Sequence, residues 1–383
     1  QEGRPAKREI PTIRGVGSRF EKDGYTHFME KEIYEQPSVI SKTLEHYIND
    51  NDQVTLGNTA LDFSNIERIT LVACGTAFYA CLTAKYWLEK LARIPTDVDV
   101  ASEFRYREPP VAAKTMAIFV SQSGETADTL AALRYCQGKA AHIWSVTNVA
   151  ESSIARESGV DLPIFAGVEI GVASTKAFTC QLTVLLSLAI KAAEDRDQIK
   201  ESERKKILGA MRNLPSLINL ALDRNEYLRL AANELAHASN ILFLGRGLMF
   251  PLALEGALKL KEITYIHAEG YAAGELKHGP IALIDETVPV VVMAPQDSLF
   301  DKTLSNVQEV MARKGRILMI ADQNGIKAAG QGLWKAIEMP PCHEILTPII
   351  YAIPAQMLAY YTAVAKGTDV DQPRNLAKSV TVE

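Results

Sequence analysis

Short apolar runs alternate with longer helical patterns along most of the chain, and the same order of segments occurs twice. In the first half, an apolar run over 69–73 precedes a glycine-containing turn and a helical pattern over 80–91. In the second half, the run 241–244 precedes Gly-Arg-Gly and a helical pattern over 252–262. A repeat at a spacing of about 170 residues is typical of a duplicated structural unit.

The correspondence between the halves continues to the end of each. Matching segments are 101–104 with 273–276, 116–120 with 288–293, 142–146 with 316–320, and the long apolar helices 173–192 with 347–366. Strands that alternate with such helices need crossover connections, which join parallel strands. We therefore predict an α/β fold of two tandem units, each a mostly parallel sheet flanked by helices. Ligands of such sheets bind at the carboxyl ends of the strands.

Polar stretches divide the chain into segments. Residues 1–30 are mostly polar and lack periodicity over most of their length, so we interpret them as a linker remnant that once joined a preceding domain. A second polar stretch, 194–204, marks a boundary between the two units. We expect a first unit over 31–200, a second over 201–366 and an ordered tail over 367–383.

The composition is that of a protein with large buried cores. Of 383 residues, 47% are apolar and 23% are charged, which excludes disorder for most of the chain. A formal net charge of -5 provides no general basic surface, so we expect no nucleic-acid partner. The five cysteines are spread out without a C-x-x-C pair, and no secretory signal begins the sequence. These features favour reduced thiols and a cytoplasmic location.

The most membrane-like stretch is 347–365, but Pro348, Pro354 and Gln356 interrupt it. A membrane-spanning helix needs about 20 consecutive, predominantly apolar residues. We therefore expect a buried helix here and no membrane partner.

Hydroxyl groups are dense where a predicted buried strand ends and a helix begins, in Ser-Gln-Ser-Gly-Glu-Thr at 121–126. Backbone N–H groups at a helix N-terminus favour anions, and Ser121, Ser123 and Thr126 add hydroxyl donors. Gly124 lets the backbone approach a ligand closely. The alternative is ordinary helix capping with Ser123 as the N-cap. We favour a phosphate site.

The second half provides a control for this interpretation. At the corresponding turn it has Pro295, which has no N–H group, and Asp297, which would repel a phosphate. We therefore expect only the first half to bind the anion. Thr76, in the first glycine turn, is placed by such a fold close enough to join the site.

A charged stripe lies on the predicted helix of the second half. Glu255, Lys259 and Glu262 share one face, while apolar residues crowd the other positions. The alternative is a surface helix with ordinary ion pairs. Because so apolar a helix is largely buried, we expect its charges to face a cleft. His267 and His278 lack metal-ligand spacing, so we expect no metal site.

The C-terminal tail has features of an ordered segment. Pro373 stiffens it, and the apolar Leu376, Val380 and Val382 are predicted to dock it. An ordered tail would be able to place Lys378 over a site.

The sequence resembles a known family, the isomerase domain of glutamine:fructose-6-phosphate amidotransferase (glucosamine-6-phosphate synthase). That domain has two sugar isomerase (SIS) subdomains. The resemblance covers about 28–383. Its motifs are Met-Glu-Lys-Glu-Ile-Tyr-Glu-Gln-Pro at 29–37, the 121–126 segment, Gly-Val-Ala-Ser-Thr-Lys at 171–176, Gly-Glu-Leu-Lys-His-Gly-Pro at 274–280, and the tail. One departure is Ala77, where the family often has a second hydroxyl.

The resemblance implies a role for each matched position. The sugar phosphate would be bound by Thr76, Ser121, Gln122, Ser123 and Thr126, and the sugar would be contacted by Val172 and Ser174.

For catalysis, the resemblance implies that Glu262 moves a proton between carbons 1 and 2 with assistance from Lys259. His278, from the neighbouring subunit of a homodimer, would open the sugar ring. Lys378 would form a Schiff base with the ketone.

The implied reaction converts fructose 6-phosphate and ammonia from glutamine into glucosamine 6-phosphate without a cofactor, and interconverts fructose 6-phosphate and glucose 6-phosphate. The family's glutaminase domain and its nucleophilic cysteine are missing from this chain, so glutaminase activity is expected to be absent. The alternatives are a stand-alone SIS isomerase, an amino-sugar-phosphate deaminase, or a regulatory SIS module without catalysis.

Overall fold

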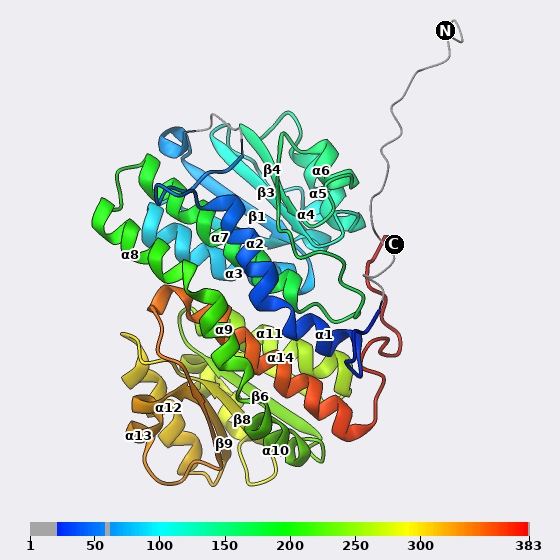
Figure 1. Ribbon diagram of the computed structural model, residues 1–383, viewed down its shortest axis with the longest axis vertical. Coiled ribbons are helices and arrows are strands. Elements are labelled where there is room, and N and C mark those ends of the chain that lie inside the picture. Colours follow the sequence, from blue (N-terminus) through cyan, green and yellow to red (C-terminus); the bar gives the residue numbers. More distant parts are fainter. Residues whose placement is uncertain (1–20, 58–61, 382–383) are drawn as a thin grey trace, which may run out of the picture.

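The computed structural model describes residues 21–57 and 62–381 (Figure 1). Most of the predicted linker, 1–20, therefore lies outside the described residues. The first helices of the described residues are α1 (Phe28–Tyr34) and α2 (Gln36–Tyr47).

The first half forms a five-stranded parallel sheet in the order β2-β1-β3-β4-β5. Its strands are β1 (Arg68–Ala73), β2 (Thr96–Val100), β3 (Thr115–Ser121), β4 (His142–Thr147) and β5 (Val160–Pro163). Its helices are α3 (Gly75–Trp87), α4 (Ala101–Arg107), α5 (Ala127–Cys136), α6 (Ser153–Glu157) and α7 (Lys176–Asp195).

The second half forms another parallel sheet in the order β10-β9-β8-β6-β7, which is the same arrangement of corresponding strands. Its strands are β6 (Asn240–Gly245), β7 (His267–Ala272), β8 (Pro289–Met293), β9 (Arg316–Asp322) and β10 (Lys335–Met339). Its helices are α11 (Met249–Thr264), α12 (Phe300–Met311), α13 (Gln323–Ala329) and α14 (Thr347–Lys366). The halves are connected by α8 (Glu201–Arg212), α9 (Leu214–Leu222) and α10 (Asn225–Leu235).

The predicted fold class and the duplication are confirmed, but four strands were missed. These are β2, β5, β7 and β10, which lie at the edges of the two sheets. Edge strands are only partly buried, and β2 mixes two aspartates with its valines. Their hydrophobic pattern is therefore weaker than that of the central strands, where every residue of β3 and β8 is buried.

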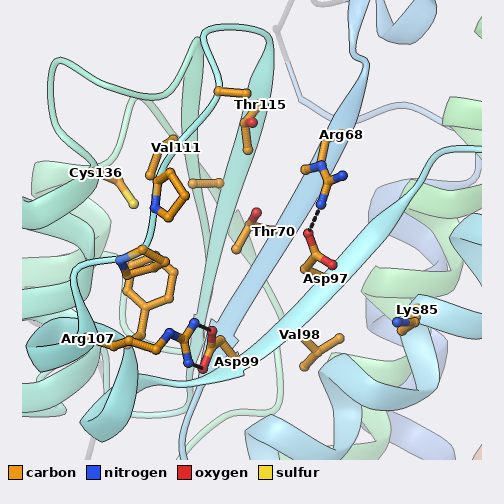
Figure 2. Close-up of a pocket in the computed structure, with 15 residues that line it drawn as sticks. Arg68, Thr70, Lys85, Asp97, Val98, Asp99, Arg107, Val111, Thr115 and Cys136 are labelled. Carbon is orange, nitrogen blue, oxygen red and sulfur yellow. Dashed lines mark hydrogen bonds and ion pairs between the residues drawn. The ribbon is translucent and has the colours of Figure 1, made fainter.

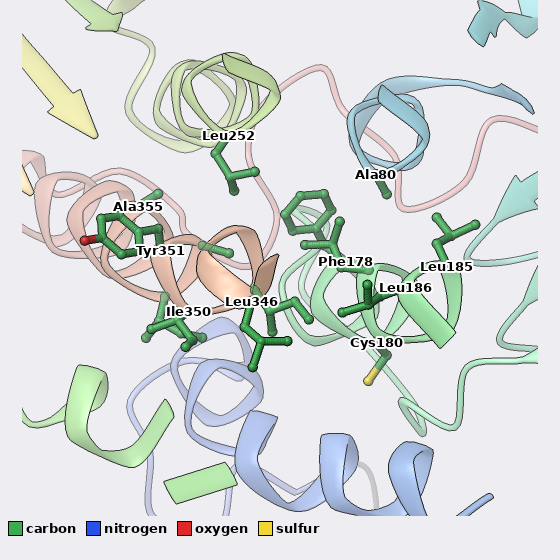
Figure 3. Packing of buried hydrophobic residues seen from close by; sticks show 14 of the residues in the cluster. Ala80, Phe178, Cys180, Leu185, Leu186, Leu252, Leu346, Ile350, Tyr351 and Ala355 are labelled. Carbon is green, nitrogen blue, oxygen red and sulfur yellow. The ribbon is translucent and has the colours of Figure 1, made fainter. Parts of the chain in front are cut away.

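Helices fill the space between the two sheets and form a shared core. Helices α3 and α7 pack together, as do α11 and α14, and α11 also contacts α3. Figure 3 shows Phe178 of α7, Leu252 of α11 and Tyr351 of α14 in this core. In each sheet, alternate residues face the shared core and a separate outer cluster. The shared core places helix α11 of the second half against the first half.

Among the described residues, one helix, α7, is long and apolar enough to cross a membrane, and 89% of its apolar window is buried inside the protein. The segment named from the sequence, 347–365, forms the buried helix α14, as predicted.

Candidate functional site

The first sheet changes direction between β1 and β3. The chain leaves β1 toward β2 on one side and returns to β3 on the other, so the loops after β1 and β3 diverge. A crevice at such a switch point is the usual ligand site of an open α/β sheet. Thr76 follows β1 and the 121–126 loop follows β3, so both predicted parts of the phosphate site lie here.

The hydroxyl-rich loop is internally ordered. Ser121 Oγ lies 3.0 Å from Thr126 Oγ1 and accepts a hydrogen bond from the Gly124 N–H group at 3.0 Å. Gly124 has φ +66°, and a Cβ atom there would lie 1.9 Å from Ser152 Oγ. Helix α5 begins at Ala127, with Thr126 at the N-cap position and no side-chain cap. The alternative in which Ser123 caps this helix is therefore wrong.

The C-terminal tail contacts the same loop. Ser379 Oγ lies 3.0 Å from Ser123 Oγ, and the Ala127 N–H group donates to the Val380 carbonyl at 3.1 Å. The Gln122 carbonyl accepts from the Asn148 N–H group at 3.2 Å. The tail therefore uses one of the N–H donors at the N-terminus of α5, a donor that is then not free for an anion.

Thr76 connects the two halves. Its hydroxyl donates to Glu255 Oε1 on α11 at 3.1 Å. Lys259 Nζ lies 3.6 Å from Glu255 Oε1 and 2.5 Å from Glu262 Oε2. The side chains of Glu255 and Lys259 are only 2% and 1% exposed, whereas that of Glu262 is 20% exposed. The expectation that all three charges face a cleft is corrected: Glu255 and Lys259 are interior, and only Glu262 reaches the surface.

Burial and neighbouring charges shift the pKa values of this cluster in opposite directions. Burial raises the pKa of Glu255 to about 8, although Lys259 opposes the shift. Burial also lowers the pKa of Lys259, but the carboxylates of Glu262 and Glu255 outweigh it, so the net pKa is above the ordinary value. Lys259 therefore remains a cation that holds Glu262 in place.

The segment between β5 and α7 holds the lysine of the tail. Lys378 Nζ donates to Glu169 Oε2 at 2.5 Å and to the Gly171 carbonyl at 2.8 Å. The Val172 N–H group donates to the Asp371 carbonyl at 3.0 Å, and Ser174 Oγ lies 3.5 Å from Glu169 Oε1. The structure therefore brings Val172 and Ser174 together with Lys378, around a carboxylate that the sequence analysis did not identify.

Glu169 had a signal in the sequence. It is a single acidic residue within the otherwise apolar run Ile-Phe-Ala-Gly-Val-Glu-Ile-Gly-Val that precedes a buried helix. An isolated charge in such a run needs a partner if it is buried. The partner is 209 positions away, so the sequence alone did not reveal it.

The tail docks through polar and aromatic contacts. The Asp371 carboxylate accepts from the Phe28 and Met29 N–H groups, both at 2.9 Å. The Arg374 guanidinium lies 4.2 Å from the centre of the Tyr265 ring. Leu376 and Val380 are 45% and 59% exposed, so the prediction that they dock the tail is wrong. Val382 lies outside the described residues.

His278 is separate from this cluster within one chain. It ends the 3-10 helix Ala273–His278 and is exposed. Among the described residues, no hydrogen bond or ion pair joins it to Glu262 or Lys378. His267 lies at the start of β7 and faces Glu269. No group of three His, Cys, Asp or Glu residues in the described part of the chain could hold a metal ion.

A hollow of about 630 Å³ lies elsewhere, beside β1, β2 and α4 (Figure 2). The arginines of its lining, Arg68 and Arg107, are paired with Asp97 and Asp99. Because these aspartates neutralise the nearby arginines, the hollow is a poorer anion site than the hydroxyl loop.

Comparison with known proteins agrees with the fold described above. The family model described as "SIS domain" matches residues 62–191 and 234–366. The chain is 53% identical, over its whole length, to a glutamine–fructose-6-phosphate aminotransferase (isomerizing) of Brucella melitensis, and it spans 63% of that protein.

Two solved structures extend the comparison. The C-terminal domain of glucosamine-fructose-6-phosphate aminotransferase from Francisella tularensis is 42% identical, with a TM-score of 0.90, over 92% of this chain and 99% of that one. A glucosamine-6-phosphate deaminase from Thermotoga maritima, 23% identical with a TM-score of 0.73 over 92% of this chain and 99% of that one, shares the fold. Sequence, strand order and the loop after β3 therefore lead to one conclusion: the chain belongs to the SIS domain family.

Proposed function

We propose that this chain binds fructose 6-phosphate and carries out the isomerisation and amino-transfer steps that form glucosamine 6-phosphate. The observation that carries the proposal is a set of contacts around the switch point of the first sheet. Ser379, next to Lys378, contacts Ser123 in the loop after β3. Thr76, after β1, donates to Glu255 of α11, which pairs with Lys259. The 53% identity to an isomerising aminotransferase supports the proposal.

In this proposal the phosphate group is bound at the first sheet. Its donors are the hydroxyl and backbone groups of Thr76, Ser121, Gln122, Ser123 and Thr126. Their place at a switch point, beside the N-terminus of α5, favours an anion. The sugar would then extend toward Val172 and Ser174, which lie beside Lys378.

The catalytic groups then have complementary tasks. Lys378 forms a Schiff base with the open-chain ketone, which makes the adjacent carbon more acidic. Glu262 moves the proton between carbons 1 and 2, because it is the partly exposed carboxylate of the cluster. The buried Lys259 cation stabilises negative charge that develops on the enediol.

The proposal also covers the structural units of the chain and the partners that the reaction needs. We infer units over 31–200 and 201–366, with a catalytic tail over 367–383. A second copy of the chain would supply His278 for ring opening, since His278 is exposed and separate from its own cluster. Ammonia would come from a glutaminase domain, and the enzyme would act in the cytoplasm.

The test is a product assay with the purified chain. We expect glucose 6-phosphate from fructose 6-phosphate alone, glucosamine 6-phosphate when ammonia is added, and no hydrolysis of glutamine. Lys378→Ala is the control and should form neither sugar. Release of ammonia from glucosamine 6-phosphate without its synthesis would instead identify a deaminase.

A further inference from the structure

The proposed Schiff-base lysine is held by a carboxylate that has no role in the function proposed above. Lys378 Nζ lies 2.5 Å from Glu169 Oε2. The Glu169 side chain is 0% exposed, while that of Lys378 is 25% exposed. The Lys378 side chain therefore lies at the border between the interior and the surface, with Glu169 on its inner side.

The other oxygen of Glu169 is fixed by the backbone. Glu169 Oε1 accepts from the Thr175 N–H group at 2.9 Å and from the Ala177 N–H group at 3.1 Å, at the start of α7. Because these bonds orient the carboxylate, Oε2 is directed at Lys378. Glu169 is thus built into the fold as a dedicated partner of the lysine, and it cannot turn toward solvent without losing both backbone bonds.

A protonated lysine cannot attack a ketone, because its nitrogen has no free electron pair. We propose that Glu169 is the catalytic acid and base of Schiff-base formation, an inference that rests on the proposed role of Lys378. It accepts a proton from the Lys378 ammonium group and later returns that proton to the leaving oxygen.

The steps balance as follows. A proton passes from Lys378 Nζ to Glu169 Oε2, which leaves a neutral amine and a carboxylic acid. The amine nitrogen attacks the ketone carbon, the carbonyl electron pair moves to oxygen, and a proton moves from nitrogen to that oxygen to give a carbinolamine. Glu169 then protonates the hydroxyl, which departs as water, and the nitrogen lone pair forms the iminium. A cation beside a carboxylate is present at the start and at the end.

The surroundings of Glu169 keep it ionised beside the lysine: burial raises the pKa of Glu169, but Lys378 and the backbone N–H groups outweigh this effect and lower it. The Glu32 carboxylate accepts from the Ile170 and Gly171 N–H groups on the same segment, and its buried Oε2 atom has no hydrogen-bond partner among the described residues. Burial and the neighbouring Glu169 raise the pKa of Glu32 to about 8. The titratable groups around the Glu169–Lys378 pair are Glu32, Lys259 of α11, and Lys176 and Cys180 of α7. A protonated Glu32 leaves Glu169 as the carboxylate that takes up the lysine proton.

The experiment is reductive trapping of the adduct between the full chain and fructose 6-phosphate by cyanoborohydride, followed by intact mass from pH 6 to 8. In the unaltered chain the proton stays within the pair, so we expect a nearly constant trapping rate. In Glu169→Gln, which keeps the acceptor for Thr175 and Ala177, we expect a rate at least tenfold lower at pH 7 that rises with pH. Glu35→Gln removes a carboxylate from Lys176, which it contacts at 2.6 Å, and should trap normally.

The outcomes distinguish a failure of the proposed role of Lys378 from a failure of the proposed role of Glu169. A complete absence of adduct in the unaltered chain overturns the role of Lys378 and that of Glu169 with it. Adduct in the unaltered chain with equal or faster trapping in Glu169→Gln, or with a slower rate whose dependence on pH is unchanged, overturns only the role of Glu169. A trapping rate in the unaltered chain that rises about tenfold per pH unit also overturns it, whether or not the variant folds.

Discussion

Glu255 and Glu262 lie seven positions apart on one helix and contact the same lysine, but their surroundings differ. Glu255 is buried against Thr76 and Lys259, and within the described part of the chain its Oε2 atom has no hydrogen-bond partner. Glu262 is partly exposed. A base that handles a substrate proton must reach the substrate, so exposure favours Glu262 and assigns Glu255 to holding Lys259.

The first residue-scale prediction concerns Glu262→Gln. The amide keeps the shape and can still accept from Lys259, but it cannot take a proton. We expect turnover to fall by roughly a hundredfold or more, with sugar-phosphate affinity nearly unchanged. Steady-state kinetics and phosphate-competition binding measure the two effects. Near-normal turnover would show that the Lys259–Glu262 contact is an ordinary ion pair.

The second residue-scale prediction concerns pH. The folded-state pKa of Glu255, about 8, is above its ordinary value of 4.5, so the folded protein binds more protons than the unfolded chain between these pH values. The free energy of unfolding should therefore fall as pH rises through this window, by up to about 1.4 kcal/mol per pH unit for this group. Urea unfolding at several pH values measures the slope, and Glu255→Gln should reduce it. Equal slopes in both proteins would contradict the raised pKa.

At the scale of single elements, the loop after β3 depends on Gly124. Its φ of +66° and the 1.9 Å approach of an added Cβ to Ser152 Oγ both oppose a side chain. We expect Gly124→Ala to displace the loop and weaken sugar-phosphate affinity at least tenfold, measured by calorimetry. Gly138 has a similar φ of +73°, and no atom of the residues that the structure describes lies within 4 Å of an added Cβ. Gly138→Ala should therefore cost only the left-handed strain of about 1 kcal/mol and leave affinity unchanged.

The tail is the second element with a testable role. A chain that ends after Pro373 keeps Asp371 and Val370, which anchor the tail to α1 and the core, but loses Lys378 and Ser379. We expect such a chain to remain folded by circular dichroism and to lose turnover completely. Full turnover in the truncated chain would show that the tail beyond Pro373 is dispensable.

At the scale of the whole molecule, the proposed homodimer makes a distinct prediction. If His278 acts on the partner's site, a mixture of His278→Ala and Lys378→Ala chains forms mixed dimers that contain one complete site. Random exchange of subunits should restore about one quarter of normal turnover. A mixture as inactive as its components would place His278 and Lys378 in the same site of one chain.

Much of this molecule follows from local patterns. The apolar runs, glycine turns and closing helices predicted two parallel α/β units, because buried strands and helices impose periodicities that are visible in any short window. The hydroxyl-rich 121–126 segment and the Glu255, Lys259 and Glu262 stripe were found in the same way. The edge strands were missed because half-exposed strands need no continuous apolar run.

Contacts between distant residues were decided only by the tertiary structure. Packing of α11 against α3 buried Glu255 and Lys259 and left Glu262 at the surface, although the spacing of the three residues is uniform enough to suggest one shared environment. The pairing of Lys378 with Glu169 crosses 209 positions. Helical and strand periodicity show which face of an element is buried. The residues that pack against that face belong to other elements, so they depend on how whole elements pack together. The sequence by itself therefore determined the fold and the chemical groups, and the tertiary structure decided which of those groups contact one another.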